Sequence, residues 1–168
     1  MKILHQLARL FKKDKKSSTN TTPQRGVSLP RYLGRWYEQA RYENWFESGM
    51  EHVFTDYTDG PDNSINVLNC GINRKGRQCT SLGRGFPTGY GRMEVSFVPP
   101  FWWFRAPYHI LYVDEDYQNA LVSGNGGEFL WLLTRQRHAA DATIGLLLRE
   151  AQLRGFDTSK LRFTKQLY

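Results

Sequence analysis

The sequence predicts an all-β domain, an eight-stranded antiparallel up-and-down barrel with one C-terminal helix packed outside it. Three observations lead to this prediction: short β-prone segments follow one another from residue 32 onward, turn-forming residues separate them at regular intervals, and the periodicity becomes helical near the C-terminus. A chain of 168 residues, 40% of them hydrophobic, suits a single core of ordinary size. Eight consecutive strands favour a barrel over a sandwich, because a closed barrel leaves no free sheet edge.

The strands are expected between turns rich in Gly, Pro, Asn and Asp, which lie at 59–63, 73–76, 87–89 and 124–127. The segments between these turns contain aromatic and β-branched residues, which favour extended backbone. The eight predicted strands are 35–42, 51–58, 64–72, 77–86, 92–98, 108–114, 119–124 and 129–135.

Helical spacing replaces strand alternation after the eighth segment. The apolar positions of residues 139–154 recur three and four residues apart, at Ile144, Leu147, Leu148 and Ala151. Gly155 stands where a left-handed C-terminal cap is expected. Leu161 and Phe163 then alternate with charged residues, which predicts a last short strand.

The positive charge is concentrated at the N-terminus. Eight of the 23 basic residues and one of the 16 acidic residues lie within residues 1–31, so this segment carries the whole net charge of +7. A neutral body argues against a nucleic-acid-binding domain, whose basic residues would lie on the folded surface. We expect a basic amphipathic arm at 1–16, a linker at 17–29 and the folded domain at 30–168. The arm is either a helix on an anionic membrane surface or a solvated terminus.

Three sequence elements occur in a characteristic order. Gly34-x-Trp36 opens the first strand, Asp114-x-x-Tyr117 lies at the turn between the sixth and seventh strands, and Arg135 ends the eighth. Together, on eight predicted strands and one helix, they resemble the signature of the lipocalins. The resemblance covers roughly residues 30 to 165, in particular to bacterial lipocalins of the outer-membrane type, which are similar to apolipoprotein D. The matching segments are RYLGRWYEQARY, MEVSFVPPF, EFLWLLTR and REAQLRGFDTSKL.

The resemblance implies a cup, closed at one end, that carries an apolar ligand such as a fatty acid or a lysophospholipid. It implies that Trp36 plugs the closed end and that the Arg135 guanidinium lies across the indole in a cation–π contact. It also implies a protein peripheral to a membrane, at the outer membrane or in the periplasm. Residues 1–16 contain neither the apolar core of a secretory signal nor a cysteine for lipid attachment, so the sequence leaves the compartment open.

Strand alternation assigns side chains to the inside of the barrel once Trp36 is taken to point inward. On this basis the cavity wall is mostly apolar and aromatic, with one carboxylate. The predicted ligand-binding residues are Glu38, Ala40, Tyr42, Val95, Phe97, Trp131 and Leu133.

Glu38 is the most informative of these residues, because a carboxylate in an apolar cup should have a raised pKa unless a cation or several donors meet it. It could receive a polar head group, act as an acid or base, or only form structural hydrogen bonds. A lipid-binding protein is therefore the first hypothesis, without enzymatic activity. The alternative is an enzyme, an isomerase or hydrolase of an apolar substrate that uses Glu38. No paired second acid or nucleophile motif supports the alternative.

The loops after the first and fifth strands place aromatic residues at the predicted open end, where they meet the basic residues Arg74, Lys75 and Arg77 of the loop after the third strand. The aromatic residues are Trp45, Phe46, Trp102, Trp103 and Phe104. Aromatic and basic side chains together are typical of a membrane interface, so we expect an anionic membrane surface as a partner. A homodimer contact and a lid over the ligand are the alternatives.

Cys70 and Cys79 flank the turn at 73–76 almost symmetrically, so they would face each other if the turn centred on residues 74 and 75. A disulfide and two reduced thiols both stay open. The four histidines have no ligand spacing, and no phosphate-binding loop is present. No metal or cofactor is expected.

Overall fold

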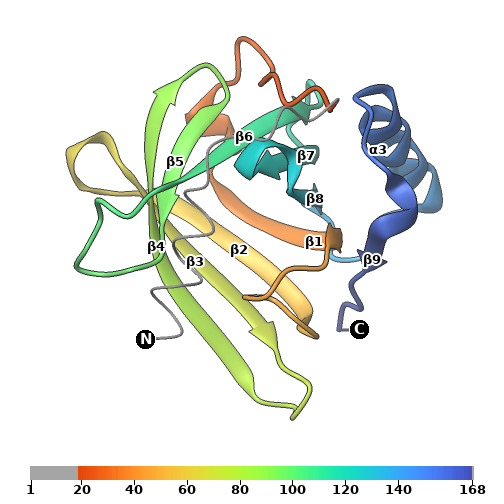
Figure 1. Cartoon of the computed structure of the whole chain (residues 1–168), viewed down its shortest axis with the longest axis horizontal. Helices are drawn as coiled ribbons and strands as arrows, with labels where there is room; N and C mark the ends of the chain where they lie inside the picture. The colour runs from red at the N-terminus through yellow and green to blue at the C-terminus, as the bar shows by residue number, and fades with distance from the viewer. Residues whose placement is uncertain (1–18, 168) are drawn as a thin grey trace.

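The structure is a computed structural model that describes residues 19–167, which form a closed barrel with a helix on its outer wall (Figure 1). Neighbouring strands are antiparallel in the order β2-β3-β4-β5-β6-β7-β8-β1, and β1 also pairs with β2, which closes the ring. The predicted fold class is confirmed. The strands are β1 (Gly34–Tyr42), β2 (Glu51–Asp59), β3 (Ile65–Ile72), β4 (Gln78–Gly89), β5 (Arg92–Ser96), β6 (Ala106–Val113), β7 (Asn119–Gly124) and β8 (Phe129–Thr134).

The C-terminal helix α3 (Asp141–Leu153) packs on the outside of the barrel, as predicted (Figure 1). Its buried residues Leu147 and Ala151 belong to a core that it shares with β6, β7, β8 and β1. Gly155 has a φ of 84°, and the amide of Phe156 donates to the carbonyl of Ala151. These two features define a Schellman cap at the C-terminus of α3. The predicted short strand is present as β9 (Leu161–Phe163), which pairs with β1 outside the ring.

The basic arm predicted for residues 1–16 lies outside the described residues. Part of the segment interpreted as a linker is bound to the barrel, since the Gln24 amide donates to the carbonyl of Ile110 and its side chain accepts from the Val113 amide. Within the described part of the chain, no helix combines the length and hydropathy that a membrane span requires.

The closed end of the barrel is built around Trp36 and the short helix α2 (Leu29–Tyr32). The indole Nε1 donates to the carbonyl of Tyr32 at 2.8 Å, and the two rings stack with centroids 4.9 Å apart. Arg135 lies over the indole at 4.0 Å, which is the expected cation–π geometry. Its guanidinium also donates to five backbone carbonyls, which belong to Arg31, Tyr32, Leu33, Arg35 and Tyr117.

The turn between β6 and β7 supports this end from the other side. Asp114 Oδ1 accepts hydrogen bonds from the amides of Gln118 and Asn119, which fixes the turn. Tyr117 adopts a φ of 55°, and its hydroxyl accepts from the amide of Ser28 at 2.7 Å. The motif residues therefore tie together the segment before β1 and the β6–β7 turn.

Candidate functional site

The barrel contains a cavity of about 350 Å³, near the lower end of the roughly 300–1,000 Å³ that is typical of small-molecule sites. It lies between β1, the loop that follows β1, strands β2 to β8, and the loop between β5 and β6. Its lining is mostly apolar and aromatic, with one polar stretch from β2, β3 and β4. The lining residues are Glu38, Trp45, Phe46, Glu47, Met50, Thr55, Tyr57, Val67, Asn69, Cys79, Thr80, Ser81, Val95, Phe97, Val98, Phe104, Ala106, Pro107, Tyr108, Val122, Phe129, Trp131 and Leu133.

Tyrosines separate the cavity from the Trp36 indole. The Tyr108 hydroxyl is hydrogen-bonded to the hydroxyls of Tyr32 at 2.7 Å and Tyr57 at 2.8 Å, and all three side chains are buried. Burial raises the pKa of each hydroxyl, so all three stay protonated. Trp36 itself does not line the cavity, so the space directly above the indole holds the protein's own rings and the ligand space begins beyond them.

A β-bulge in β1 changes which side chains face the cavity. Glu38 pairs with Leu133, but the next residue in register is Ala40, opposite Leu132, so Gln39 is extra. The extra residue reverses the alternation, and Arg41 instead of Ala40 takes the inner face beside Glu38.

The placement of Ala40 and Tyr42 inside the cup is therefore wrong. Both belong to the outer core under α3, where Tyr42 packs edge-on against Phe156 and donates from its hydroxyl to the carbonyl of Asp157. The error follows from applying strict alternation across the bulge.

The remaining predicted ligand-binding residues, Glu38, Val95, Phe97, Trp131 and Leu133, all line the cavity. They come from β1, from β5 and the residue just after it, and from β8, so the cavity brings together opposite sides of the barrel. Their role in binding stays a prediction.

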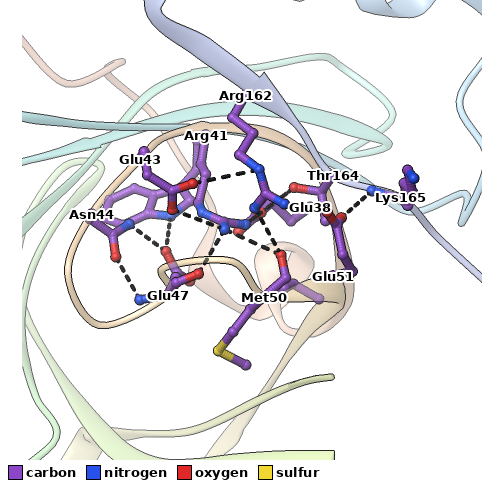
Figure 2. A network of polar contacts seen from close by, with 12 residues as sticks. Glu38, Arg41, Glu43, Asn44, Glu47, Met50, Glu51, Arg162, Thr164 and Lys165 are labelled. Carbon is purple, nitrogen blue, oxygen red and sulfur yellow. Dashed lines mark hydrogen bonds and ion pairs between the residues drawn. The ribbon is translucent and has the colours of Figure 1, made fainter. Parts of the chain in front are cut away.

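Glu38 lies at the centre of a buried polar network (Figure 2). Its Oε1 accepts from Arg41 Nη1 at 2.5 Å and from the Thr164 hydroxyl, next to β9. The second guanidinium nitrogen, Nη2, donates to the carbonyls of Glu47 at 2.7 Å and Met50 at 3.2 Å, and it pairs with Glu43 at 3.2 Å. Arg41 thereby joins β1 to the loop that covers the cavity.

Glu47 is the second acid of the cavity wall, and only 4% of it is exposed. Its Oε2 accepts from Asn44 Nδ2 at 2.6 Å and from the indole Nε1 of Trp131 at 3.0 Å, while Oε1 accepts from Asn69 Nδ2 at 3.3 Å. Glu47 thus ties the β1–β2 loop to β3 and β8.

The pKa of Glu38 is raised from 4.5 to about 7, first by burial and second by the nearby charge of Glu47, while Arg41 and the Thr164 hydroxyl act in the opposite direction. The expectation of a raised pKa is thus met, although a cation is present. The reason is that Arg41 shares its charge among three acids, so it compensates Glu38 only in part.

The predicted rim residues fall into two groups. Trp45, Phe46 and Phe104 line the cavity, and Phe46 packs edge-on against Phe129 with ring centroids 5.5 Å apart. Trp102 and Trp103 do not line it.

Trp102 lies under the Arg84 guanidinium at 4.6 Å, which fixes the loop between β5 and β6 against β4. Trp103 is 67% exposed and packs against Phe101, which is itself 45% exposed. The loop therefore presents an aromatic surface next to the cavity.

The opposed placement of Cys70 and Cys79 is also wrong. Cys70 pairs with Thr80 and Cys79 with Gly71, so the two thiols point to opposite faces of the sheet, and both are free. The cause is the turn, which ends one residue later than expected, since Asn73 donates to the carbonyl of Arg77 and Gly76 has a φ of 72°.

The residues that sequence reasoning missed are Arg41, Glu47, Tyr57 and Tyr108. Strict alternation places Arg41 on the outer face of β1, because it does not account for the bulge at Gln39. Glu47 lies in a loop, to which strand alternation does not apply. Tyr57 and Tyr108 could have been found by extending the inward alternation to β2 and β6. Within residues 19–167, no group of three or more His, Cys, Asp or Glu side chains is arranged to hold a metal ion.

Comparison with known proteins identifies the family. The lipocalin-like domain matches residues 27–166 of this chain. The outer membrane lipoprotein Blc of Escherichia coli K12 is 35% identical over 158 residues, which covers 88% of each chain. Apolipoprotein D of Macaca fascicularis is 27% identical over 160 residues, covering 88% of this chain and 82% of the other.

Among solved structures, lobster apocrustacyanin A1 superimposes with a TM-score of 0.69 at 20% identity, covering 83% of this chain and 79% of that one. This likeness concerns the fold alone. The family match extends over the whole barrel, including β1, the cavity wall and α3. The chain therefore belongs to the lipocalin family, whose members bind small hydrophobic ligands.

Proposed function

We propose that this protein carries a lipid with a single hydrocarbon chain, of the fatty acid or lysophospholipid kind, in its barrel cavity. The observation that carries the proposal is the cavity of about 350 Å³ with its apolar and aromatic wall. Each buried methylene contributes about 0.8 kcal/mol, so a chain of about 12 carbons gains roughly 9 kcal/mol before the cost of association. A micromolar Kd corresponds to about 8 kcal/mol net, so burial of the alkyl chain accounts for binding weaker than micromolar once the association cost is subtracted.

Filling the cavity tests this proposal. Val67 lines the cavity, whereas its neighbour Leu68 does not and pairs with the exposed Leu82 on the outer face. Val67→Trp should abolish binding of dodecanol in calorimetry, and Leu68→Trp should bind it as the wild type does. Circular dichroism checks that both variants are folded. Equal binding by the two variants would exclude the cavity as the binding site.

A carrier also returns its ligand chemically unchanged. Native mass spectrometry of protein purified from its own host, followed by lipid extraction, should recover an intact single-chain lipid in about one-to-one ratio. Recovery of a product altered by incubation with the protein would favour the enzyme hypothesis, in which Glu38 acts as acid or base.

We further propose that the lipid enters from an anionic membrane surface on which the loop between β5 and β6 docks. The support is the exposed pair Phe101 and Trp103, which lies beside the cavity-lining Phe104 and close to Arg105. Tryptophan beside arginine is favourable at the level of lipid head groups.

The combined variant Trp102→Ser and Trp103→Ser should lose most of its binding to vesicles that contain phosphatidylglycerol. Tyr90→Ser is the matched control, because Tyr90 is 75% exposed and lies in the turn between β4 and β5, outside the loop. Unchanged vesicle binding together with loss of a dimer in size-exclusion chromatography would show that the loop is a homodimer contact instead.

A further inference from the structure

The described residues that line the cavity include two acids and no basic side chain. Two carboxylates line it, Glu38 and Glu47, and among the described residues that line it none is Lys, Arg or His. Arg41 pairs with Glu38, but its side chain is fully buried and does not line the cavity. Its guanidinium is already bound to Glu38, to Glu43 and to the carbonyls of Glu47 and Met50, so it is not available to a ligand.

Both acids keep acceptor capacity toward the cavity. The described hydrogen bonds to the Glu38 carboxylate all end on Oε1, from Arg41 and Thr164, so within residues 19–167 none reaches Oε2. The Glu47 carboxylate accepts two of its three hydrogen bonds on Oε2, and Oε1 has only the 3.3 Å contact with Asn69. A carboxylate oxygen can accept about two hydrogen bonds, so a donor in the cavity finds free positions on both residues.

The surroundings of Glu47 also suit a cation. Trp131 donates to Glu47 and packs against Phe129 and Phe46, with ring centroids 5.8 and 6.5 Å away, and Phe46 packs against Trp45 at 5.3 Å. Aromatic faces attract an ammonium group, most strongly where water is excluded. A carboxylate head group would meet two like charges in the same space, which is unfavourable in a poorly solvated site.

We infer that the cavity selects a single-chain amphiphile whose head group is an ammonium, paired with Glu38 and Glu47, over one whose head group is a carboxylate. This inference rests on the proposed function and specifies its ligand class. The net charge of +7 would favour an anion in any nonspecific association, so a preference for the cation has to come from the cavity.

The test compares three ligands with the same chain: dodecylammonium, dodecanoate and dodecanol. In calorimetry at about pH 8 the wild type should bind dodecylammonium about tenfold more tightly than dodecanoate, the order expected for a partly desolvated charge pair. Glu47→Gln should remove most of this preference, because the glutamine oxygen can keep the hydrogen bonds from Asn44 and Trp131 while the charge is lost. Its affinity for dodecanol should stay unchanged.

Glu43→Gln is the matched control, since it removes an acid from the same network that does not line the cavity, and it should keep the full preference. Dodecylphosphocholine identifies the source of the ammonium: a parallel loss of its affinity in Glu47→Gln indicates a lysolipid head group, whereas a loss confined to dodecylammonium indicates a free amine. If the wild type binds dodecanol but prefers dodecanoate, or if Glu47→Gln keeps the preference, the inference is overturned. Failure to bind dodecanol would instead overturn the proposed function.

Discussion

Replacing Glu38 by glutamine should make the protein's stability depend less on pH. The pKa of Glu38 is raised from 4.5 to about 7, chiefly by burial and secondly by Glu47, so the folded state holds the proton more tightly than the unfolded chain does. The wild type must then lose stability as the pH rises from about 4.5 through 7. At roughly 1.4 kcal/mol for each pH unit between the two pKa values, the loss reaches about 3 kcal/mol.

Glutamine cannot ionise and resembles the protonated acid in shape, so Glu38→Gln should escape this loss. We compare the free energy of unfolding of the variant minus that of the wild type at two pH values. This difference should be about 2–3 kcal/mol more positive at about pH 8 than at about pH 5, whatever its value at pH 5. Urea unfolding followed by tryptophan fluorescence at both pH values measures the difference. Glu43→Gln, with 41% of the acid side chain exposed, should show no such change.

A constant difference between Glu38→Gln and wild type at both pH values would refute the reasoning. It would mean that Arg41 and Thr164 compensate the buried carboxylate fully, so that its charge costs nothing in the folded state. A difference that falls with rising pH would show that the ion pair with Arg41 dominates over burial.

Three further predictions concern the closed end and the cysteines. Arg135→Lys should lower the free energy of unfolding by about 3 kcal/mol in urea titrations, because lysine cannot bond five carbonyls at once or cover the Trp36 indole; a loss below about 1 kcal/mol would contradict the importance of this contact. Gly34→Ala should cost about 1–3 kcal/mol by the same measure, since Gly34 has a φ of 100° and a Cβ there would lie 3.1 Å from the guanidinium; an unchanged midpoint would speak against the strain. Thiol titration of unfolded protein after mild oxidation should still find Cys70 and Cys79 both free, and formation of an intramolecular disulfide with the fold intact would contradict the register.

Most of the barrel could be predicted from the sequence because its determinants are local. Alternation within each strand, the turn residues between strands and the spacing of Leu147 and Ala151 each depend on a few neighbouring residues, and the structure follows them closely. The predictions that failed did so because the strand register differs by one residue from the one that the sequence pattern indicates. The β3–β4 turn takes one residue more than its sequence indicates, and β1 accommodates Gln39 as an extra residue.

Such insertions are decided by tertiary contacts that no local pattern reveals. Gln39 is buried, and its side-chain amide donates to the Thr134 hydroxyl at 2.9 Å and to the carbonyls of Gln136 and Arg137. These bonds hold the extra residue in place, and all three partners lie nearly a hundred residues further along the chain. Sequence alternation therefore places Glu38 correctly, before the bulge, and fails for Ala40 and Tyr42, after it.

The bulge also explains why the site contains buried charge at all. Without it Arg41 would face the outer core under α3, among leucines, and Glu38 would lie alone in an apolar cup. With it the guanidinium reaches Glu38 and the carbonyls of Glu47 and Met50, so the β1–β2 loop is fixed over the cavity and brings its own acid, Glu47, into the wall. One extra residue in β1 thus produces the cavity's excess of carboxylates, on which the inferred preference for a cationic head group depends.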